Sequence, residues 1–367
     1  MDIVEIVQAN LLTPIVLFFI LGVVAASIKS DLRIPEQLSA FLPIYLLAAI
    51  GLHGGLEMRK SGLEHLAIPI AVAVALALVI TVNHYQILRR LGKFNIFDSY
   101  ALASTYGSVG AVTFSVGLSF LKNQNISSEG YITAILAVLE PISLIFSIFL
   151  VNMAVEKELK RRKEPFSKIT KQDTKTEIVH DVNNGTNIDS DTKNKAVNIR
   201  EILRETITGK AIIILLGSIV IGYVIGDHGF VSIKPVFEDL FFGALVIFIL
   251  EMGILAGQRL SDIKKVGPFL IAFAVLIPTF NGTIGVIIAN YLGLSIGGAV
   301  MFGVLFASAS FIAAPAVLRV AIPKANPSLY ITSSLGITFP YIIIALLPIL
   351  LIISTTFHNL SSISLFG

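Results

Sequence analysis

Long apolar stretches, separated by short polar segments, run along most of this chain. Ten of them have the length of about twenty residues that an α-helix needs to cross a membrane. The first five cover residues 11–28, 35–57, 64–88, 97–121 and 129–154, and the second five cover 208–227, 235–257, 266–292, 294–320 and 327–354. The pattern predicts an all-α, polytopic membrane protein with ten transmembrane helices.

One polar segment divides these runs into two equal sets. Residues 156–207 are rich in Lys, Glu, Asp, Asn and Thr, so they cannot bury enough apolar surface to fold alone. We therefore predict a first repeat over 1–155, a flexible cytoplasmic loop over 156–207, and a second repeat over 208–367. Because each set has an odd number of spans, the two sets insert with opposite orientation.

Faint internal similarity supports this inverted repeat. Residues 34–38 resemble residues 234–238, and residues 51–55 resemble residues 253–257. An arginine follows shortly after segment 51–55 and another shortly after segment 253–257. The matches share their order and their spacing along the chain. They pair the fourth span with the ninth, as in transporters built from two inverted repeats.

Polar stretches of small residues interrupt the same two spans. The first is STYGSVGAVT at 104–113, and the second is ASASFIAAP at 307–315. Unwound backbone at membrane depth is tolerated only where it is buried in protein or lines a wet cavity. Small residues also allow close helix packing, which is the alternative interpretation. Two such stretches in equivalent places favour broken helices around the substrate site of a secondary transporter.

Two carboxylates lie inside apolar runs, where an ionisable group is costly and commonly functional. Glu140 precedes Pro141 in the fifth run, and Glu251 lies in the seventh. Glu140 either couples a cation or proton, or serves as a structural partner of the carbonyl that Pro141 leaves without a donor. Glu251 either has a similar role or pairs with a polar group of another helix.

Composition excludes several other classes of protein. The chain is 55% hydrophobic and 14% charged, whereas ordinary soluble domains are roughly 25% charged. The absence of Cys excludes disulfides and thiolate chemistry. Without a P-loop, a Gly-x-Ser-x-Gly elbow or a His-Glu-x-x-His motif, we expect neither ATP-driven transport nor an enzyme. His53 and His84 have no second metal ligand nearby, and we expect both at membrane interfaces.

The basic residues predict the orientation in the membrane, because cytoplasmic loops carry an excess of Lys and Arg. The small net charge of +3 therefore reports topology rather than nucleic-acid binding. With both termini outside, the inner segments hold Lys29, Arg33, Arg89, Arg90, Lys93, Lys157, Lys160, Arg161, Arg162, Lys163, Arg259, Lys264, Lys265, Arg319 and Lys324. The outer segments hold Arg59, Lys60, Lys122 and Lys234, of which Arg59 and Lys60 are the main exception to the rule. The N-terminus lacks a basic region, so we expect no cleaved signal peptide.

The chain resembles the sodium-dependent bicarbonate transporters first known from cyanobacteria. The resemblance rests on Ile-Pro-Glu at 34–36, Ile-Gly-Leu-His-Gly-Gly at 50–55, and the segment from Leu318 to Ser334 that contains Ala-Ile-Pro-Lys-Ala-Asn-Pro-Ser-Leu-Tyr-Ile. It implies a scaffold of helices 1, 2, 6 and 7 and a core of helices 3–5 and 8–10 that moves like an elevator. It also implies a homotrimer in a bacterial inner membrane, in contact with lipids and regulated by a PII-like protein.

The two breaks differ from those of the bicarbonate-transporting members. Two hydroxyl residues of the family's first break are Gly110 and Val112 here, and an aspartate and a serine of its second break are Phe311 and Ala313. Glu140 falls where the family has an aspartate. The resemblance therefore implies the same fold with a more apolar pocket, and it leaves open both the transported anion and the number of sodium ions.

These observations define two overlapping sets of candidate residues. Free N–H groups at the start of a half-helix attract anions, and free carbonyls at its end attract cations. We predict a substrate site made of Gly107, Ser108, Gly110, Ala111, Thr113, Ser308, Ser310 and Phe311. We predict a cation site made of Ser104, Thr113, Glu140, Ser308 and Ser310. Apart from a sodium ion, we expect no metal or cofactor.

The sequence thus predicts sodium-coupled symport of a small monoanion, bicarbonate or a related anion. The alternative is a membrane receptor or regulatory scaffold that kept the transporter fold without efficient transport.

Overall fold

A computed structural model describes residues 10–61, 66–163, 208–322 and 324–364, and within these ranges the chain is helical without strands. The first half contains α2 (Pro14–Ser27), α3 (Glu36–Ser61), α4 (Ala67–Arg90), α5 (Ile96–Gly107), α6 (Ala111–Asn123) and α7 (Ile132–Lys163). The second half contains α9 (Lys210–Phe230), η3 (Pro235–Asp239), α10 (Phe241–Gln258), α11 (Leu260–Val266), α12 (Pro268–Tyr291), α13 (Ile296–Ala307), α14 (Ala313–Ala321), α15 (Pro327–Ile331), η4 (Thr332–Thr338), α16 (Phe339–Tyr341), η5 (Ile342–Leu346) and α17 (Leu347–Ser364). The elements labelled η are π-helical.

Every predicted apolar run contains helix. Seven helical stretches among the described residues are long and apolar enough to cross a membrane. The shorter apolar helices α2, α13 and the Ile132–Ser147 part of α7 correspond to the three remaining runs. The helix α7 continues to Lys163, beyond the predicted end of its run at residue 154. From residue 164 on, the predicted central loop lies outside the described residues.

One group of helices is formed by α2, α3, α9 and α10, in which α3 packs along α9 and α2 packs along α10. Glycines make both crossings close: a Cβ on Gly55 would lie 2.0 Å from the carbonyl oxygen of Ile219, and one on Gly253 would lie 2.2 Å from that of Phe19. These glycines belong to the two similar segments 51–55 and 253–257. In these segments, small residues therefore serve helix packing.

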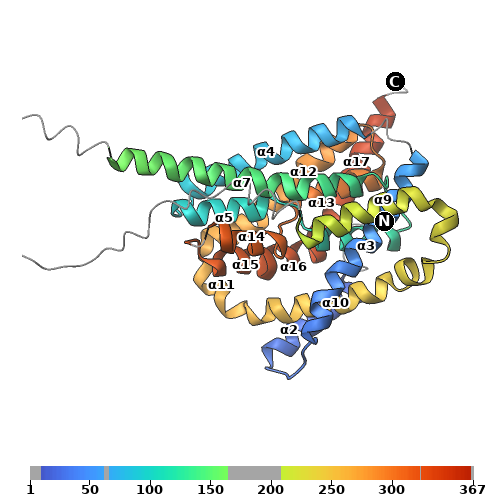
Figure 1. Ribbon diagram of the computed structural model, residues 1–367, viewed down its shortest axis with the longest axis horizontal. Helices are drawn as coiled ribbons and strands as arrows, with labels where there is room; N and C mark the ends of the chain where they lie inside the picture. Colours follow the sequence, from blue (N-terminus) through green and yellow to red (C-terminus); the bar gives the residue numbers. More distant parts are fainter. Residues whose placement is uncertain (1–9, 62–65, 164–207, 323, 365–367) are drawn as a thin grey trace, which may run out of the picture.

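The remaining helices form the second group, which holds the breaks. Here α4 packs on α5 and α7, while α12 packs on α13 and α17. In Figure 1 these helices run side by side along the long axis of the molecule, with α2 and α10 along its lower edge. Fully buried Leu, Ile and Phe side chains fill the space between them.

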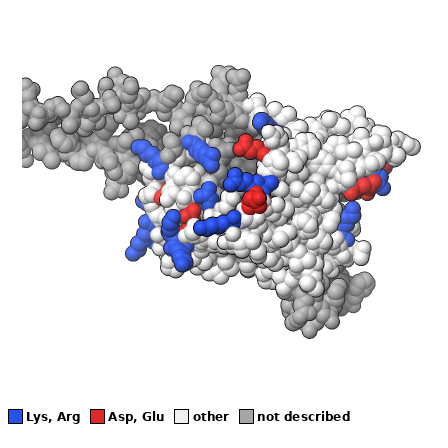
Figure 2. Space-filling model, turned by 90° about the horizontal axis from the view of Figure 1, so that it is seen from below, with Lys and Arg blue, Asp and Glu red and all other residues white. Residues whose placement is uncertain are grey.

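Charged side chains gather at the ends of this bundle rather than along its sides. Figure 2 shows most of the visible Lys and Arg at the end of the molecule where α11 lies, and a smaller mixed group at the opposite end. This distribution follows the predicted inner and outer loops. Apolar side chains such as Ile213, Val220 and Val224 of α9 are exposed along the sides, as expected for a surface that faces lipid.

The structure explains why two basic residues, Arg59 and Lys60, lie in a segment that we predict to be outside. Arg59 donates hydrogen bonds to the α9 carbonyls of Tyr223 (3.2 Å) and Val224 (2.9 Å). The neighbouring Lys60 pairs with Asp227 at 3.3 Å. Both side chains therefore have structural partners at the end of α9, so their position does not contradict a topology set by the other basic residues.

Candidate functional site

Both predicted breaks are present, and they have the same local design. The first helix ends at Gly107, and Ser108 is extended (φ −97°, ψ 144°) before α6 begins at Ala111. The second ends at Ala307, and Ser308 is likewise extended (φ −72°, ψ 159°) before α14 begins at Ala313. Glycine, serine and alanine allow this because they crowd the unwound chain least.

The starts of the two broken helices are also alike. Asn95 accepts a hydrogen bond from the Asp98 N–H at the start of α5, and Ser295 accepts one from the Gly298 N–H at the start of α13. Such side chains replace carbonyl partners that the first turn lacks. At both starts, a polar residue also contacts the opposite half of the chain: Asp98 at the start of α5 and Ser295 at the start of α13.

The breaks lie against each other. The Ser310 N–H donates to the Thr105 carbonyl at 2.9 Å, and the Gly110 N–H donates to the Ser308 hydroxyl oxygen at 2.8 Å. A Cβ on Gly110 would lie 2.9 Å from the Ala309 carbonyl oxygen, so only glycine allows this approach. The structure thus brings together two segments that are far apart in the sequence, as predicted.

A cavity of about 70 Å³ lies at this crossing. One water molecule needs about 10–15 Å³ of such space, so there is room for a small hydrated ion. Its walls are Gly110, Ala111, Val112 and Ser115 of the first break and α6, Ser310, Phe311, Ile312 and Ala313 of the second break and α14, Glu140 of α7, Pro43, Leu46 and Leu47 of α3, and Phe248 of α10. The cavity therefore lies between the two groups of helices.

Two helix N-termini point their positive ends at this cavity. Ala111 begins α6, Ala313 begins α14, and both line the wall. The first N–H groups of a helix have no partner within it, and the helix dipole adds partial positive charge. Together they form an environment that favours a small anion.

Several buried oxygen atoms around the breaks lack a hydrogen-bond partner among the described residues. They are the hydroxyls of Ser104, Ser108 and Thr113 and one carboxylate oxygen of Glu140. An unpaired buried polar atom costs about 1–3 kcal/mol. Hydroxyl and carboxylate oxygens are hard ligands, so a bound cation would satisfy these atoms.

The predicted residues divide into three groups. Gly110, Ala111, Ser310, Phe311 and Glu140 line the cavity directly. Ser104, Ser108, Thr113 and Ser308 are buried within the two broken helices or at their breaks. Gly107 lies against α4, where a Cβ would lie 2.2 Å from the Thr81 hydroxyl oxygen, so a side chain at this position would collide with Thr81.

Phe311 makes the cavity more apolar than the breaks alone suggest. Its ring packs edge to face against Phe339, with centroids 5.1 Å apart, and the side chain is 9% exposed. Sequence reasoning missed the apolar walls from α3 and α10, since Pro43, Leu47 and Phe248 lie in runs without a break. Ser115 could have been predicted from the sequence, because it lies one turn after Ala111 on the same helix.

The other polar residues within the helices have different surroundings. Our expectation that His84 lies at an interface is wrong: it is 1% exposed and bonded to Asn281 (2.9 Å) between α4 and α12. Glu251 lies near Ser39 of α3, a polar residue of another helix, and its Oε2 is buried without a hydrogen-bond partner among the described residues. His53 is partly buried, with Nδ1 2.9 Å from the Ala49 carbonyl oxygen.

An all-helical membrane fold with two broken helices around one cavity is the architecture of a secondary transporter. Comparison with protein families agrees, since the family model for the Na⁺-dependent bicarbonate transporter superfamily matches residues 14–355. The chain belongs to this superfamily. No match is found among curated proteins.

Proposed function

We propose that this protein is a secondary active transporter that couples the uptake of a small monoanion, bicarbonate or a related anion, to sodium. One observation carries the proposal: the two breaks meet at one cavity, with the N-termini of α6 and α14 and the carboxylate of Glu140 in its walls. The family of the chain, whose name specifies sodium and bicarbonate, supports the same conclusion.

The anion and the cation use different parts of this arrangement. The anion lies in the cavity, against the N–H groups at the start of the two half-helices. The sodium ion binds beside it, among the free carbonyls at the ends of α5 and α13, the partner-free hydroxyls of Ser104, Ser108 and Thr113, and Glu140. Ser308 and Ser310 hold the two breaks together and support both sites.

The cavity selects for a compact anion with an apolar side. Phe311 and Val112 occupy its wall in place of the family's polar residues, so the anion makes fewer hydrogen bonds with side chains here. Burying an ion without compensating hydrogen bonds is costly, which disfavours strongly hydrated divalent anions. Monoanions are therefore the substrates to test.

The architecture that accompanies this function is ten spans in two inverted repeats. The matched glycine crossings, the matched breaks and the matched caps support the repeat. Helices α2, α3, α9 and α10 form the scaffold, and the remaining helices form a core that moves past it like an elevator. Both termini lie outside, in a bacterial inner membrane, and the basic end that contains α11 faces the cytoplasm.

Assembly and regulation follow the family. We propose a homotrimer, with the exposed apolar side chains of α9 among the candidates for the subunit contact. A PII-like protein binds at the basic cytoplasmic end. Cross-linking in membranes tests the trimer, and co-purification with and without that partner tests the regulation.

The decisive experiment measures uptake of labelled bicarbonate into cells or proteoliposomes at fixed pH, with sodium varied. Uptake that saturates with sodium and disappears in potassium buffer supports symport. Other monoanions, added as competitors, identify the preferred substrate. Absence of uptake of every anion tested, with the protein present in the membrane, would instead favour the receptor or scaffold function.

A further inference from the structure

A second and larger cavity lies at the end of the molecule opposite to α11. Its volume is about 490 Å³, and its walls come from α3 and the η3–α10 segment on one side and from α6 and α7 on the other. It follows the same helices as the central cavity: Ser115 and Leu118 are one turn apart on α6, and Leu47 and Ile50 are one turn apart on α3. The two cavities therefore lie one after the other along α3 and α6.

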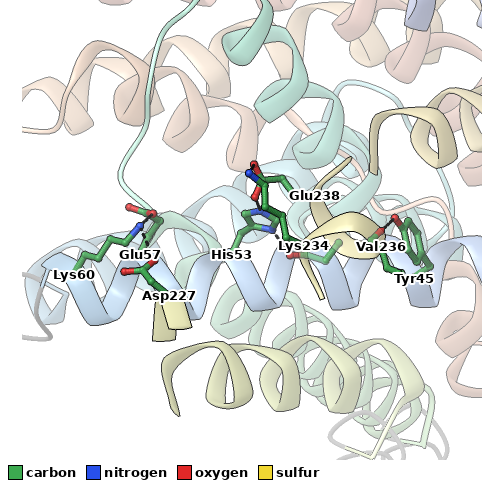
Figure 3. Close-up of polar contacts among 9 residues, drawn as sticks. Tyr45, His53, Glu57, Lys60, Asp227, Lys234, Val236 and Glu238 are labelled. Atoms are coloured by element: carbon green, nitrogen blue, oxygen red, sulfur yellow. Dashed lines mark hydrogen bonds and ion pairs between the residues drawn. The ribbon is translucent and has the colours of Figure 1, made fainter. Parts of the chain in front are cut away.

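The carboxylates in the walls of this outer cavity already have partners. Glu57 pairs with Lys60 at 2.9 Å, and Glu238 lies 3.6 Å from the Lys234 ammonium and 3.7 Å from His53 Nε2. Figure 3 shows these contacts along α3, with His53 facing Glu238.

The third carboxylate is held by a helix terminus. Glu129 accepts hydrogen bonds from the backbone N–H of Ser295 (2.6 Å) and from its hydroxyl (3.0 Å). This places the carboxylate at the positive end of α13, whose dipole partly neutralises it.

Lys122 differs from all of these charges. It lies in the last turn of α6 and lines the outer cavity. Its ammonium makes no ion pair or hydrogen bond with any residue that the structure describes. The cavity thus presents one cation that has no partner among the described residues, next to carboxylates that each have a polar partner.

We propose that the outer cavity is a second subsite for a small inorganic monoanion, in which Lys122 Nζ attracts the anion before it reaches the central cavity. The proposal rests on the proposed transport function and adds an access site to it. A positive charge in a concave, partly apolar wall raises the local concentration of anions. Neutral Asn123 completes this part of the wall.

The first test measures this attraction without using transport. The natural chain has no Cys, so Asn123→Cys introduces a unique thiol into the wall beside Lys122. Two thiosulfonate reagents of similar size, one carrying a sulfonate and one an ammonium, are applied to either side of oriented membrane vesicles. Lys122→Gln should lower the ratio of the sulfonate rate to the ammonium rate about 25-fold, because loss of one nearby unit charge changes the two rates about fivefold each in opposite directions, and Lys122→Arg should preserve the ratio.

The matched control is Gln124→Cys, since Gln124 lies just beyond Asn123 and outside the cavity walls. In Gln124→Cys, the ratio of the sulfonate rate to the ammonium rate should change less when Lys122 is replaced. Bicarbonate should slow modification of the Asn123→Cys thiol more strongly than that of the Gln124→Cys thiol. An unchanged ratio in Lys122→Gln, or no effect of bicarbonate at Asn123→Cys, would overturn the proposal.

The second test uses uptake. Lys122→Gln should raise the half-saturating bicarbonate concentration about fivefold with an unchanged maximal rate, and added salt should reduce the difference from wild type. Wild-type protein without uptake would contradict the proposed function, while the thiol rates would still decide on the subsite. Normal half-saturation in Lys122→Gln would contradict the subsite alone.

Discussion

At the scale of single residues, the polar groups around the breaks serve two separate purposes. Ser308 and Ser310 have partners: they bond to Gly110 and Ala314 and hold the unwound backbone in place. Ser108 and Thr113 lie in the same region with buried hydroxyls that have no partner among the described residues. The first pair explains the structure of the crossing, and the second pair is available to an ion.

Glu140 is the residue whose charge tests sodium coupling. Removing one charged ligand costs about 1.5–3 kcal/mol, so Glu140→Gln should raise the half-saturating sodium concentration at least about tenfold. Glu140→Asp keeps the charge and should be tolerated better. The measurement is uptake against sodium at fixed pH and against pH at fixed sodium. Full sodium dependence in the Gln variant would remove Glu140 from the cation site.

Gly110 tests whether the close approach of the breaks matters. In Gly110→Ala the new methyl group would lie 2.9 Å from the Ala309 carbonyl oxygen, so the breaks must separate. Overpacking of this kind costs about 1–3 kcal/mol, and we expect uptake to fall about tenfold. The matched control is Gly217→Ala, where a Cβ meets no heavy atom within 4 Å. Equal effects in the two variants would contradict the model of a tight crossing.

At the scale of elements, the two halves tie down each other's broken helices. The start of α13 is held by Glu129, which precedes α7, through Ser295. The start of α5 is held in the reverse sense: Asp98 accepts a hydrogen bond from the Asn326 N–H, which precedes α15, at 2.7 Å. Each broken helix is therefore anchored by the loop that follows the other one, which supports the proposed inverted repeat.

The two helix caps should contribute similarly to stability. Replacing an N-cap residue with alanine costs about 1 kcal/mol, so Asn95→Ala and Ser295→Ala should each lower the melting temperature of the purified protein. The exposed Ser232, whose hydroxyl donates to the local Gly229 carbonyl, provides the control variant Ser232→Ala. We expect little change in that control. A loss confined to one cap would show that the two halves are not equivalent.

At the scale of the whole molecule, charge and helix length together predict the orientation. Tyr291 ends α12 and is 85% exposed, whereas Lys265 lies in α11 just before α12 begins. In this chain without Cys, Tyr291→Cys and Lys265→Cys should react with a membrane-impermeant thiol reagent from opposite sides. Labelling of Tyr291→Cys from outside supports the proposed topology. Labelling of both residues from the same side would contradict the prediction that α12 crosses the membrane.

Sequence alone was sufficient for the helices and their breaks. A stretch such as 268–291 is long and apolar enough to cross a membrane, and backbone in lipid must satisfy its own hydrogen bonds, so such runs have to be helical. Gly and Ser at 107–110 and Ser at 308–310 tolerate unwound backbone, and Pro315 suits the first turn of α14 because it lacks an N–H that this turn leaves without a partner. These are local properties, which neighbouring residues in the chain determine.

Only the tertiary structure decided which side chains meet. His84 and His53 look alike in the sequence, yet one is buried against Asn281 and the other lines the outer cavity. Lys122 became informative only when the other charges around it proved to be paired. Such roles depend on contacts between residues far apart in the chain. These contacts cannot be predicted from the hydrophobic pattern or from the spacing of residues.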